Sequence, residues 1–284
     1  MAVAQALTAP RAAICGLPMD RPQIMGILNV TPDSFSDGGR LTNVDRAVDA
    51  AAQMVADGAA ILDIGGESTR PGATYVEVEH EIERTAPVIE AIRARFATPI
   101  SIDTRKAPVA RAALQAGASL INDVSAMAYD PDMAQVAATA GVPICLMHAQ
   151  GTPETMQDNP TYTDVVLEVV QHLSDRVAAA RAAGIAEANI IVDPGIGFGK
   201  TLDHNLALLS HLSVLHMLGV PVLVGASRKR FIGTLTRVEA ADERVHGSVA
   251  VALSAVAQGA QILRVHDVAA TAQAVTMWQA VNAG

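Results

Sequence analysis

Acidic and amide side chains recur where short apolar runs of this sequence end. Asp103, Asn122 and Asp193 each close such a run in a different part of the chain. Taken singly, each could be a helix N-cap or a satisfied buried group. Taken together, they suit a flat heterocycle that carries paired N–H donors and a lactam, because carboxylates accept N–H bonds and an amide both donates and accepts.

Lysines are scarce in this chain, and all three follow predicted strands. The three lysines are Lys106, Lys200 and Lys229, and five arginines complete the set: Arg70, Arg105, Arg228, Arg230 and Arg264. A basic ring on an otherwise acidic protein favours an anionic small-molecule ligand, and a phosphorylated one suits it best.

Spacing excludes several familiar catalytic motifs. GIGFGKT at 195–201 has three residues between its first glycine and GK, where a P-loop needs four, so its glycines serve a tight turn or a close backbone approach to a ligand. His148 and His266 lack a third ligand at a recognisable spacing, and there is no GxSxG elbow. We therefore expect neither a protein-bound transition metal nor a covalent enzyme intermediate.

Two features stay open at this point. GGESTRPGA at 65–73 is either an ordinary loop or a functional one, because Ser, Thr, Gly and Pro are common turn residues. Met147 is either core filler or the floor of an aromatic pocket.

The elements that must position these residues are short strands alternating with helices. Segments 43–58 and 164–184 have helical spacing and end at glycine. Eight apolar runs, each followed by a polar turn, predict strands at 23–29, 59–65, 98–103, 118–123, 142–148, 189–195, 220–227 and 260–267. This pattern predicts a single-domain (β/α)₈ TIM barrel over 23–284 after an N-terminal extension at 1–22, with a doubly wound open sheet as the alternative.

In such a barrel the loops after the strands build the active site. Side chains two apart on a strand share a face, so Arg264 and His266 should point the same way, as should Ser101 and Asp103. Most of the chemically capable residues lie at predicted strand ends, namely Asn29, Asp63, Asp103, Asn122, His148, Asp193, Arg264 and His266.

Composition narrows the class of protein. The 284 residues are 50% hydrophobic but 3% aromatic, which suits a buried parallel sheet covered by alanine-rich helices. A net charge of −9 argues against a general nucleic-acid or membrane surface. Two cysteines, Cys15 and Cys145, are too few for a disulfide framework and fit a reducing cytoplasm, and we see neither an export signal nor a membrane span.

Eight motifs occur in order along nearly the whole chain. They are GILNVTPDSFSDGG, DIGGESTRPGA, ISIDTRK, LINDVSA, CLMHAQGTPETMQ, DPGIGFGKT, GASRKRFIG and RVHDV. Together they resemble the dihydropteroate synthase family of folate biosynthesis. The resemblance implies a (β/α)₈ barrel, usually a homodimer, that joins p-aminobenzoate to 6-hydroxymethyl-7,8-dihydropterin diphosphate, and that is the target of sulfonamides.

The resemblance also implies roles for individual residues. Asp103 and Lys229 would be catalytic, and the pterin would be held by Asp103, Asn122, Asp193, Lys229 and Met147. The diphosphate would bind to Asn29, Arg264 and His266, with Mg²⁺ on the diphosphate near Asn29. The implied course is SN1-like: the C–O bond breaks first, and the arylamine then attacks a pterin-methylene cation.

The polar stretch after the first strand would be a mobile lid, with Asp37 as a further catalytic residue. Together with the STRPG segment it would complete a p-aminobenzoate pocket made of Phe35, Thr69, Arg70, Pro71, Phe198, Ser227 and Lys229. One position departs from the family pattern, because many relatives have serine after the lysine where this chain has Arg230. That arginine could bind the p-aminobenzoate carboxylate or point to solvent.

Two rival functions remain at this stage. A methyltetrahydrofolate-binding methyltransferase would share the Asp, Asn and Asp set, but it would not be expected to carry both NVTPDSFSDGG and GGESTRPGA. A catalytically silent pterin-binding subunit would be expected to lose the arginine or histidine of the diphosphate site, whereas Arg264 and His266 are present.

Overall fold

Eight parallel strands alternate with helices, as the sequence predicts. The computed structural model describes residues 9–31, 40–68, 72–152 and 155–282. The strands are β1 (Gln23–Asn29), β2 (Ile61–Gly65), β3 (Ile100–Asp103), β4 (Leu120–Asp123), β5 (Ile144–Met147), β6 (Ile190–Asp193), β7 (Leu223–Val224) and β8 (Ile262–Val265). The α-helices are α2 (Arg40–Ala56), α3 (Val78–Arg93), α4 (Ala107–Gln115), α5 (Met133–Ala140), α6 (Val165–Ala182), α7 (Leu202–Ser210), α8 (Arg230–Thr236), α9 (Val245–Ala257) and α10 (Val268–Asn282).

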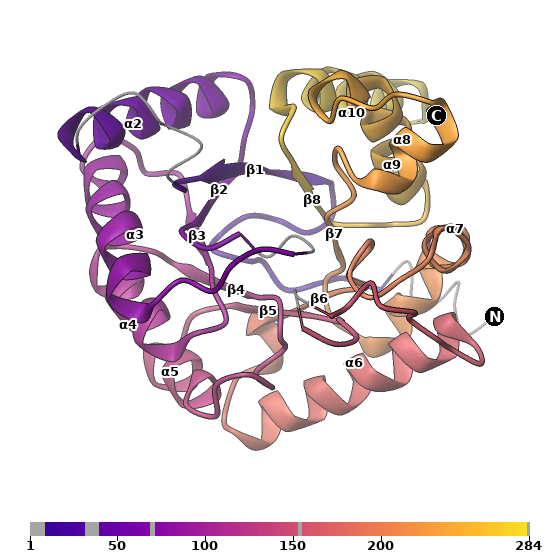
Figure 1. Cartoon of the computed structure of the whole chain (residues 1–284), viewed down its shortest axis with the longest axis horizontal. Coiled ribbons are helices and arrows are strands. Elements are labelled where there is room, and N and C mark those ends of the chain that lie inside the picture. Colours follow the sequence, from indigo (N-terminus) through magenta and orange to yellow (C-terminus); the bar gives the residue numbers. More distant parts are fainter. Residues whose placement is uncertain (1–8, 32–39, 69–71, 153–154, 283–284) are drawn as a thin grey trace.

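The strands form one ring and the helices surround it. Strand order is β6-β5-β4-β3-β2-β1-β8-β7, and a parallel bridge between Val192 and Val222 joins the two ends. Figure 1 shows the helices encircling the strands in chain order. The (β/α)₈ barrel is thus confirmed, and the open-sheet alternative is excluded.

Alternation along the strands sorts side chains into two cores. One side of each strand packs against the helices in a large apolar cluster that includes Ile64, Ile102 and Ile121. The other side faces the barrel axis, where a second cluster contains Met25, Ile61, Leu120, Cys145, Ile191, Leu223 and Ile262. Two residues further along several strands, the same inward face changes to polar residues, which places the site at the carboxyl ends.

The segment before β1 packs into the barrel. Ile14 and Leu17 form an antiparallel bridge, and Ile14 and Met19 join the interior cluster, 0% and 4% exposed. Whether residues 1–22 behave as a separate extension stays a prediction, but these two side chains belong to the barrel core. No helix among the described residues is long and apolar enough to cross a membrane.

The seventh unit differs most from its sequence-based description. The expected strand at 220–227 is reduced to Leu223–Val224, because Pro221 has no N–H to donate and Gly225 leads into a turn. It is preceded by a 3₁₀ helix, Leu212–Leu218, and followed by two helices, α8 and α9, with a 3₁₀ turn, Asp242–Arg244, between them. A further 3₁₀ turn, Glu187–Asn189, leads into β6.

Candidate active site

An arginine bridges two carboxylates at the carboxyl end of the barrel. Arg264 on β8 donates from Nε to Asp63 Oδ2 at 2.6 Å and from Nη2 to Asp103 Oδ2 at 2.6 Å. Asp63 lies on β2 and Asp103 on β3, so three strands meet at one guanidinium. The other oxygen of each carboxylate, Oδ1, is buried without a hydrogen-bond partner among the residues that the structure describes.

Asn122 and Asn29 extend this polar layer in both directions. Asn122 on β4 is the register partner of Asp103, and its Nδ2 donates to Asp63 Oδ2 at 3.3 Å. Asn29 ends β1 opposite Gly65. A side chain at Gly65 would place its Cβ 3.7 Å from both Asn29 Oδ1 and Asp103 Oδ2, so this glycine keeps open the space between the amide and the carboxylate.

Asp193 and Lys229 form the opposite part of the layer. Asp193 on β6 is the register partner of the buried Met147 on β5, and its Oδ1 accepts from the Gly195 N–H at 2.7 Å. Lys229 donates from Nζ to the carbonyl of Ile196. The same Nζ lies 4.2 Å from the centre of the Phe198 ring. Met147, Asp193, Lys229 and Phe198 are thus neighbours through the 194–200 loop.

Burial favours the uncharged forms of the two aspartates and of Lys229, and so shifts their pKa values. Burial raises the pKa of Asp103 to about 7, although Arg264 opposes the shift. Burial likewise raises the pKa of Asp193, against the effect of Lys229. It lowers the pKa of Lys229 to about 7. For Arg264 burial by itself lowers the pKa, but Asp63 and Asp103 outweigh it and the net shift is upward, so the guanidinium stays charged.

Ser227 and His266 are direct neighbours beside this layer. Ser227 Oγ accepts from the His266 N–H at 3.2 Å and lies 3.1 Å from His266 Nδ1. Ser227 is buried, and His266 follows β8 two residues after Arg264. The serine predicted to contact p-aminobenzoate therefore touches the histidine predicted to contact the diphosphate.

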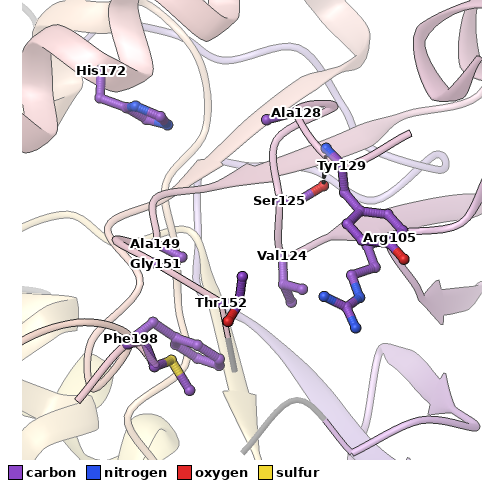
Figure 2. A pocket seen from close by; sticks show the side chains of 11 residues that line it. Arg105, Val124, Ser125, Ala128, Tyr129, Ala149, Gly151, Thr152, His172 and Phe198 are labelled. Carbon is purple, nitrogen blue, oxygen red and sulfur yellow. Dashed lines mark hydrogen bonds between the residues drawn. The ribbon is translucent and has the colours of Figure 1, made fainter. Parts of the chain in front are cut away.

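A cavity of about 220 Å³ opens next to Phe198. Figure 2 shows Phe198 on one side and Arg105 with Tyr129 on the other. The guanidinium carbon of Arg105 stacks 4.4 Å from the centre of the Tyr129 ring. Phe198 therefore has two faces: it lies against Lys229 within the polar layer and it also lines this cavity.

The expected basic ring is largely neutralised. Lys106 pairs with Glu81 at 2.6 Å and Arg228 pairs with Asp267 at 2.5 Å. Arg105 pairs with Glu67 at 3.3 Å, and Arg264 is shared between two carboxylates. Within the described ranges, Lys200 and Lys229 have no carboxylate oxygen within 4.0 Å. Arg230 is exposed on the first turn of α8.

Part of the predicted site lies outside the described residues: Phe35, Asp37, Thr69, Arg70 and Pro71. The remaining predicted residues lie in or beside the polar layer. The predicted site does not include Asp63, the carboxylate that accepts from Arg264 Nε. Its spacing from Ile61, which faces the barrel interior, is the signal that places Asp63 on the same face.

The oxygen ligands near Asn29 are suited to a hard cation such as Mg²⁺ that is held mainly by a bound diphosphate. Among the described residues no group of three His, Cys, Asp or Glu side chains could hold a metal. Mg²⁺ does not need one, since it is usually bound by one or two oxygen ligands together with phosphates and water. The Asn29 amide oxygen, which like Asp103 borders the open space at Gly65, is compatible with that mode.

Comparison with known proteins identifies the family. A family model described as pterin binding enzyme matches residues 25–266. The chain is 48% identical over 264 residues to the dihydropteroate synthase of Escherichia coli K12, covering 93% of each chain. A structure of Xanthomonas albilineans dihydropteroate synthase with 4-aminobenzoic acid matches with a TM-score of 0.91 and 53% identity, covering 98% of this chain and 100% of that one.

The Yersinia pestis dihydropteroate synthase in a sulfonamide drug complex gives a TM-score of 0.89 at 48% identity, over 94% of this chain and 97% of the other. The family match spans most of the barrel, and the identities are high over nearly full chains. The chain therefore belongs to the dihydropteroate synthases, transferases within the pterin-binding enzymes.

Proposed function

We propose that this chain joins p-aminobenzoate to 6-hydroxymethyl-7,8-dihydropterin diphosphate and releases pyrophosphate and 7,8-dihydropteroate. The observation that carries the proposal is the pair of buried carboxylate oxygens, Asp63 Oδ1 and Asp103 Oδ1, without partners among the described residues. A buried acceptor is costly to leave unpaired, and a pterin ring supplies N–H donors that would pair with it.

The pterin would lie in the polar layer between Asp103, Asn122, Asp193 and Lys229. The first two are register partners, so a carboxylate and an amide stand side by side at one level of the barrel. Asp193 and Met147 are also register partners, which puts an apolar, polarizable side chain next to the second carboxylate. This arrangement offers acceptors, donors and a flat apolar contact to one heterocycle.

The diphosphate would bind at Asn29, Arg264 and His266. The Arg264 guanidinium has five N–H donors, and its carboxylate partners accept from Nε and Nη2, so Nη1 can donate to a phosphate oxygen. Asn29 would hold Mg²⁺ through its amide oxygen. When bound with the diphosphate, that ion would supply charge neutralisation to the leaving group.

The reaction would proceed by loss of pyrophosphate before attack. Breaking the C–O bond leaves a positive charge on the pterin methylene group, and the p-aminobenzoate nitrogen then forms the new C–N bond and loses a proton. Asp103 would stabilise that positive charge, and Asp37 would assist it from the loop after β1. Arg264 would stabilise the departing anion. No enzyme nucleophile is needed.

The p-aminobenzoate pocket would be formed by Phe198 and Ser227 together with Phe35, Thr69, Arg70 and Pro71. A relative from Yersinia pestis is a dihydropteroate synthase in a sulfonamide drug complex, which supports sulfonamides as inhibitors here. We further propose a homodimer, as the family resemblance implies. The free thiols of Cys15 and Cys145 suit the cytoplasm.

A direct test measures pyrophosphate release from the pterin diphosphate with and without p-aminobenzoate and Mg²⁺. The proposal expects 7,8-dihydropteroate only when all three are present. Tight binding of a pterin without turnover, under conditions in which the Escherichia coli relative is active, would instead establish the silent-subunit alternative.

A further inference from the structure

The loop at 194–200 makes one backbone hydrogen bond of its own, from the Phe198 N–H to the Gly195 carbonyl at 3.0 Å, and its next four carbonyls accept from side chains. Gly195, Gly197 and Gly199 have φ values of 65°, 84° and 60°, the left-handed region that favours glycine. A Cβ on Gly195 would collide with the His148 carbonyl oxygen, and one on Gly199 would collide with the carbonyl oxygen of Gln150. The chain therefore turns repeatedly against the segment that follows β5, and four of its carbonyls need side-chain partners.

Four side chains supply those partners, three of them from outside the loop. Lys229 donates to the Ile196 carbonyl. Gln157 Nε2 donates to Gly197 O at 2.9 Å, and Tyr162 Oη donates to Gly199 O at 2.8 Å. The carbonyl of Phe198 itself accepts from Lys200 Nζ at 2.9 Å. Each carbonyl from 196 to 199 is thus held by a different side chain.

Three acceptors surround the Lys200 ammonium group. Nζ lies 2.8 Å from His148 Nδ1, 2.9 Å from Phe198 O and 3.4 Å from His148 O. Burial, followed by the nearby Lys200 charge, lowers the pKa of His148 to about 2, so its ring is neutral and Nδ1 has a lone pair to accept with. The amine therefore links the Phe198 backbone to the end of β5.

Packing alone does not account for a lysine at this position. Lys200 is 3% exposed and, within the described part of the chain, no carboxylate oxygen lies within 4.0 Å of its amine. Lys106 is equally buried but pairs with Glu81 at 2.6 Å and Glu67 at 3.1 Å. Burial lowers the pKa of Lys200 to about 7. Because no carboxylate offsets it, burying this amine is costly to stability.

We propose that Lys200 is a positioning residue that sets the Phe198 ring for the arylamine substrate by tying the Phe198 carbonyl to His148. The inference rests on the aryl-binding role proposed above for Phe198. The ring contacts the Lys229 ammonium group on one side and lines the adjacent cavity (Figure 2), so a shift of this peptide would move one wall of the pocket. Displacements of about 1 Å can reduce rates by about 100-fold.

The test compares Lys200→Met with Arg93→Met. Arg93 is a matched control because it also holds three carbonyls, those of Gly117, Phe96 and Thr98, at 3.1, 3.3 and 3.0 Å, but in turns leading to β3 and β4 at the other end of the barrel. We expect Lys200→Met to raise KM for p-aminobenzoate by about tenfold or more. We expect the Kd for 6-hydroxymethylpterin, from calorimetry, to stay within about twofold of wild type.

Arg93→Met is expected to lower Tm and leave both constants unchanged. If Lys200→Met instead weakens both ligands in parallel with a loss of Tm, the role is merely structural and the inference fails. If Lys200→Met does not fold, His148→Leu removes one acceptor of the same amine, and the same selective rise in KM is expected from it.

A double-mutant cycle with Phe198→Ala separates this inference from the function on which it rests. Wild-type KM for p-aminobenzoate in Phe198→Ala would overturn the aryl role of Phe198. A raised KM in Phe198→Ala with wild-type KM in Lys200→Met would overturn the Lys200 role alone. If Lys200 acts through Phe198, the double variant should have nearly the KM of Phe198→Ala; multiplicative effects would contradict that.

Discussion

At the residue scale, Asp103 pairs with Arg264 through one oxygen, while the other is buried without a hydrogen-bond partner among the described residues. Asp103→Asn keeps the volume but removes the charge. We expect kcat to fall by about 100-fold or more, because stabilisation of positive charge in the transition state is lost. Melting should stay within a few degrees of wild type, since the change also removes repulsion between Asp103 and Asp63.

The readout for Asp103→Asn is steady-state kinetics together with thermal melting. Asp164→Asn is the control, because it makes the same substitution at an exposed helix cap. There Asp164 Oδ1 accepts from Val166 N and Leu167 N at 3.0 Å. Near-normal turnover in a folded Asp103→Asn enzyme would contradict the proposed role.

Acid–base behaviour is also set at this scale. The pKa of Asp103 and the pKa of Lys229 both lie at about 7. Asp103 would act as a carboxylate, so kcat/KM should fall as pH drops below about 7. Lys229 would act as an ammonium group, so kcat/KM should also fall as pH rises above about 7. We expect a narrow bell whose limbs belong to the coupled groups rather than to either one.

The measurement is kcat/KM for the pterin diphosphate from about pH 5.5 to about pH 9, a range that spans both limbs. Because the substrate phosphates titrate as well, binding of 6-hydroxymethylpterin, which lacks them, serves as the control over the same range. A flat plateau across neutral pH in both experiments would contradict the expectation.

At the scale of elements, the 194–200 loop should be intolerant of side chains. Gly199 has φ 60° and no room for a Cβ beside Gln150, whereas Gly141, with φ 65°, has no heavy atom within 4 Å of the place that a Cβ would take. Both Gly→Ala changes incur the left-handed penalty of about 1–2 kcal/mol. Gly199→Ala should lower the free energy of unfolding by clearly more, as measured by urea denaturation; equal losses would show that the loop can relax.

The same scale shows what the sequence could predict. The period of apolar runs predicted every strand, and the two-residue alternation put Ser101 and Asp103 on one face of β3, because both are local patterns. The contact between Lys200 and His148 joins residues 52 positions apart. The pairing of Arg264 with Asp63 spans 201 positions. Such pairings depend on how neighbouring loops and strands meet, and no local period encodes them.

Across the whole molecule, charge is arranged to suit a small anionic substrate without a basic surface. The chain has a net charge of −9, and most cations near the barrel mouth are paired with carboxylates. Attraction of the diphosphate would therefore depend on a few donors inside the mouth, not on long-range steering. We expect kcat/KM to change little with added monovalent salt, and a steep decline with ionic strength would contradict this.

The polar layer lies at the carboxyl ends of the strands, and the segment before β1 packs at the opposite end of the barrel, where we expect it to contribute to stability. Ile14 is fully buried in the interior cluster with Ile61 and Leu120, below the polar layer. Ile14→Ala should lower the free energy of unfolding by about 2–5 kcal/mol, because it removes buried methyl groups and leaves a cavity. Kinetic constants at room temperature should stay near wild type, since the residues proposed to contact substrate lie at the other end. Val281→Ala, at a side chain 75% exposed on α10, is the control and should change neither quantity. Unchanged stability in Ile14→Ala would mean that the segment before β1 is an appendage and that the strands alone close this end of the barrel.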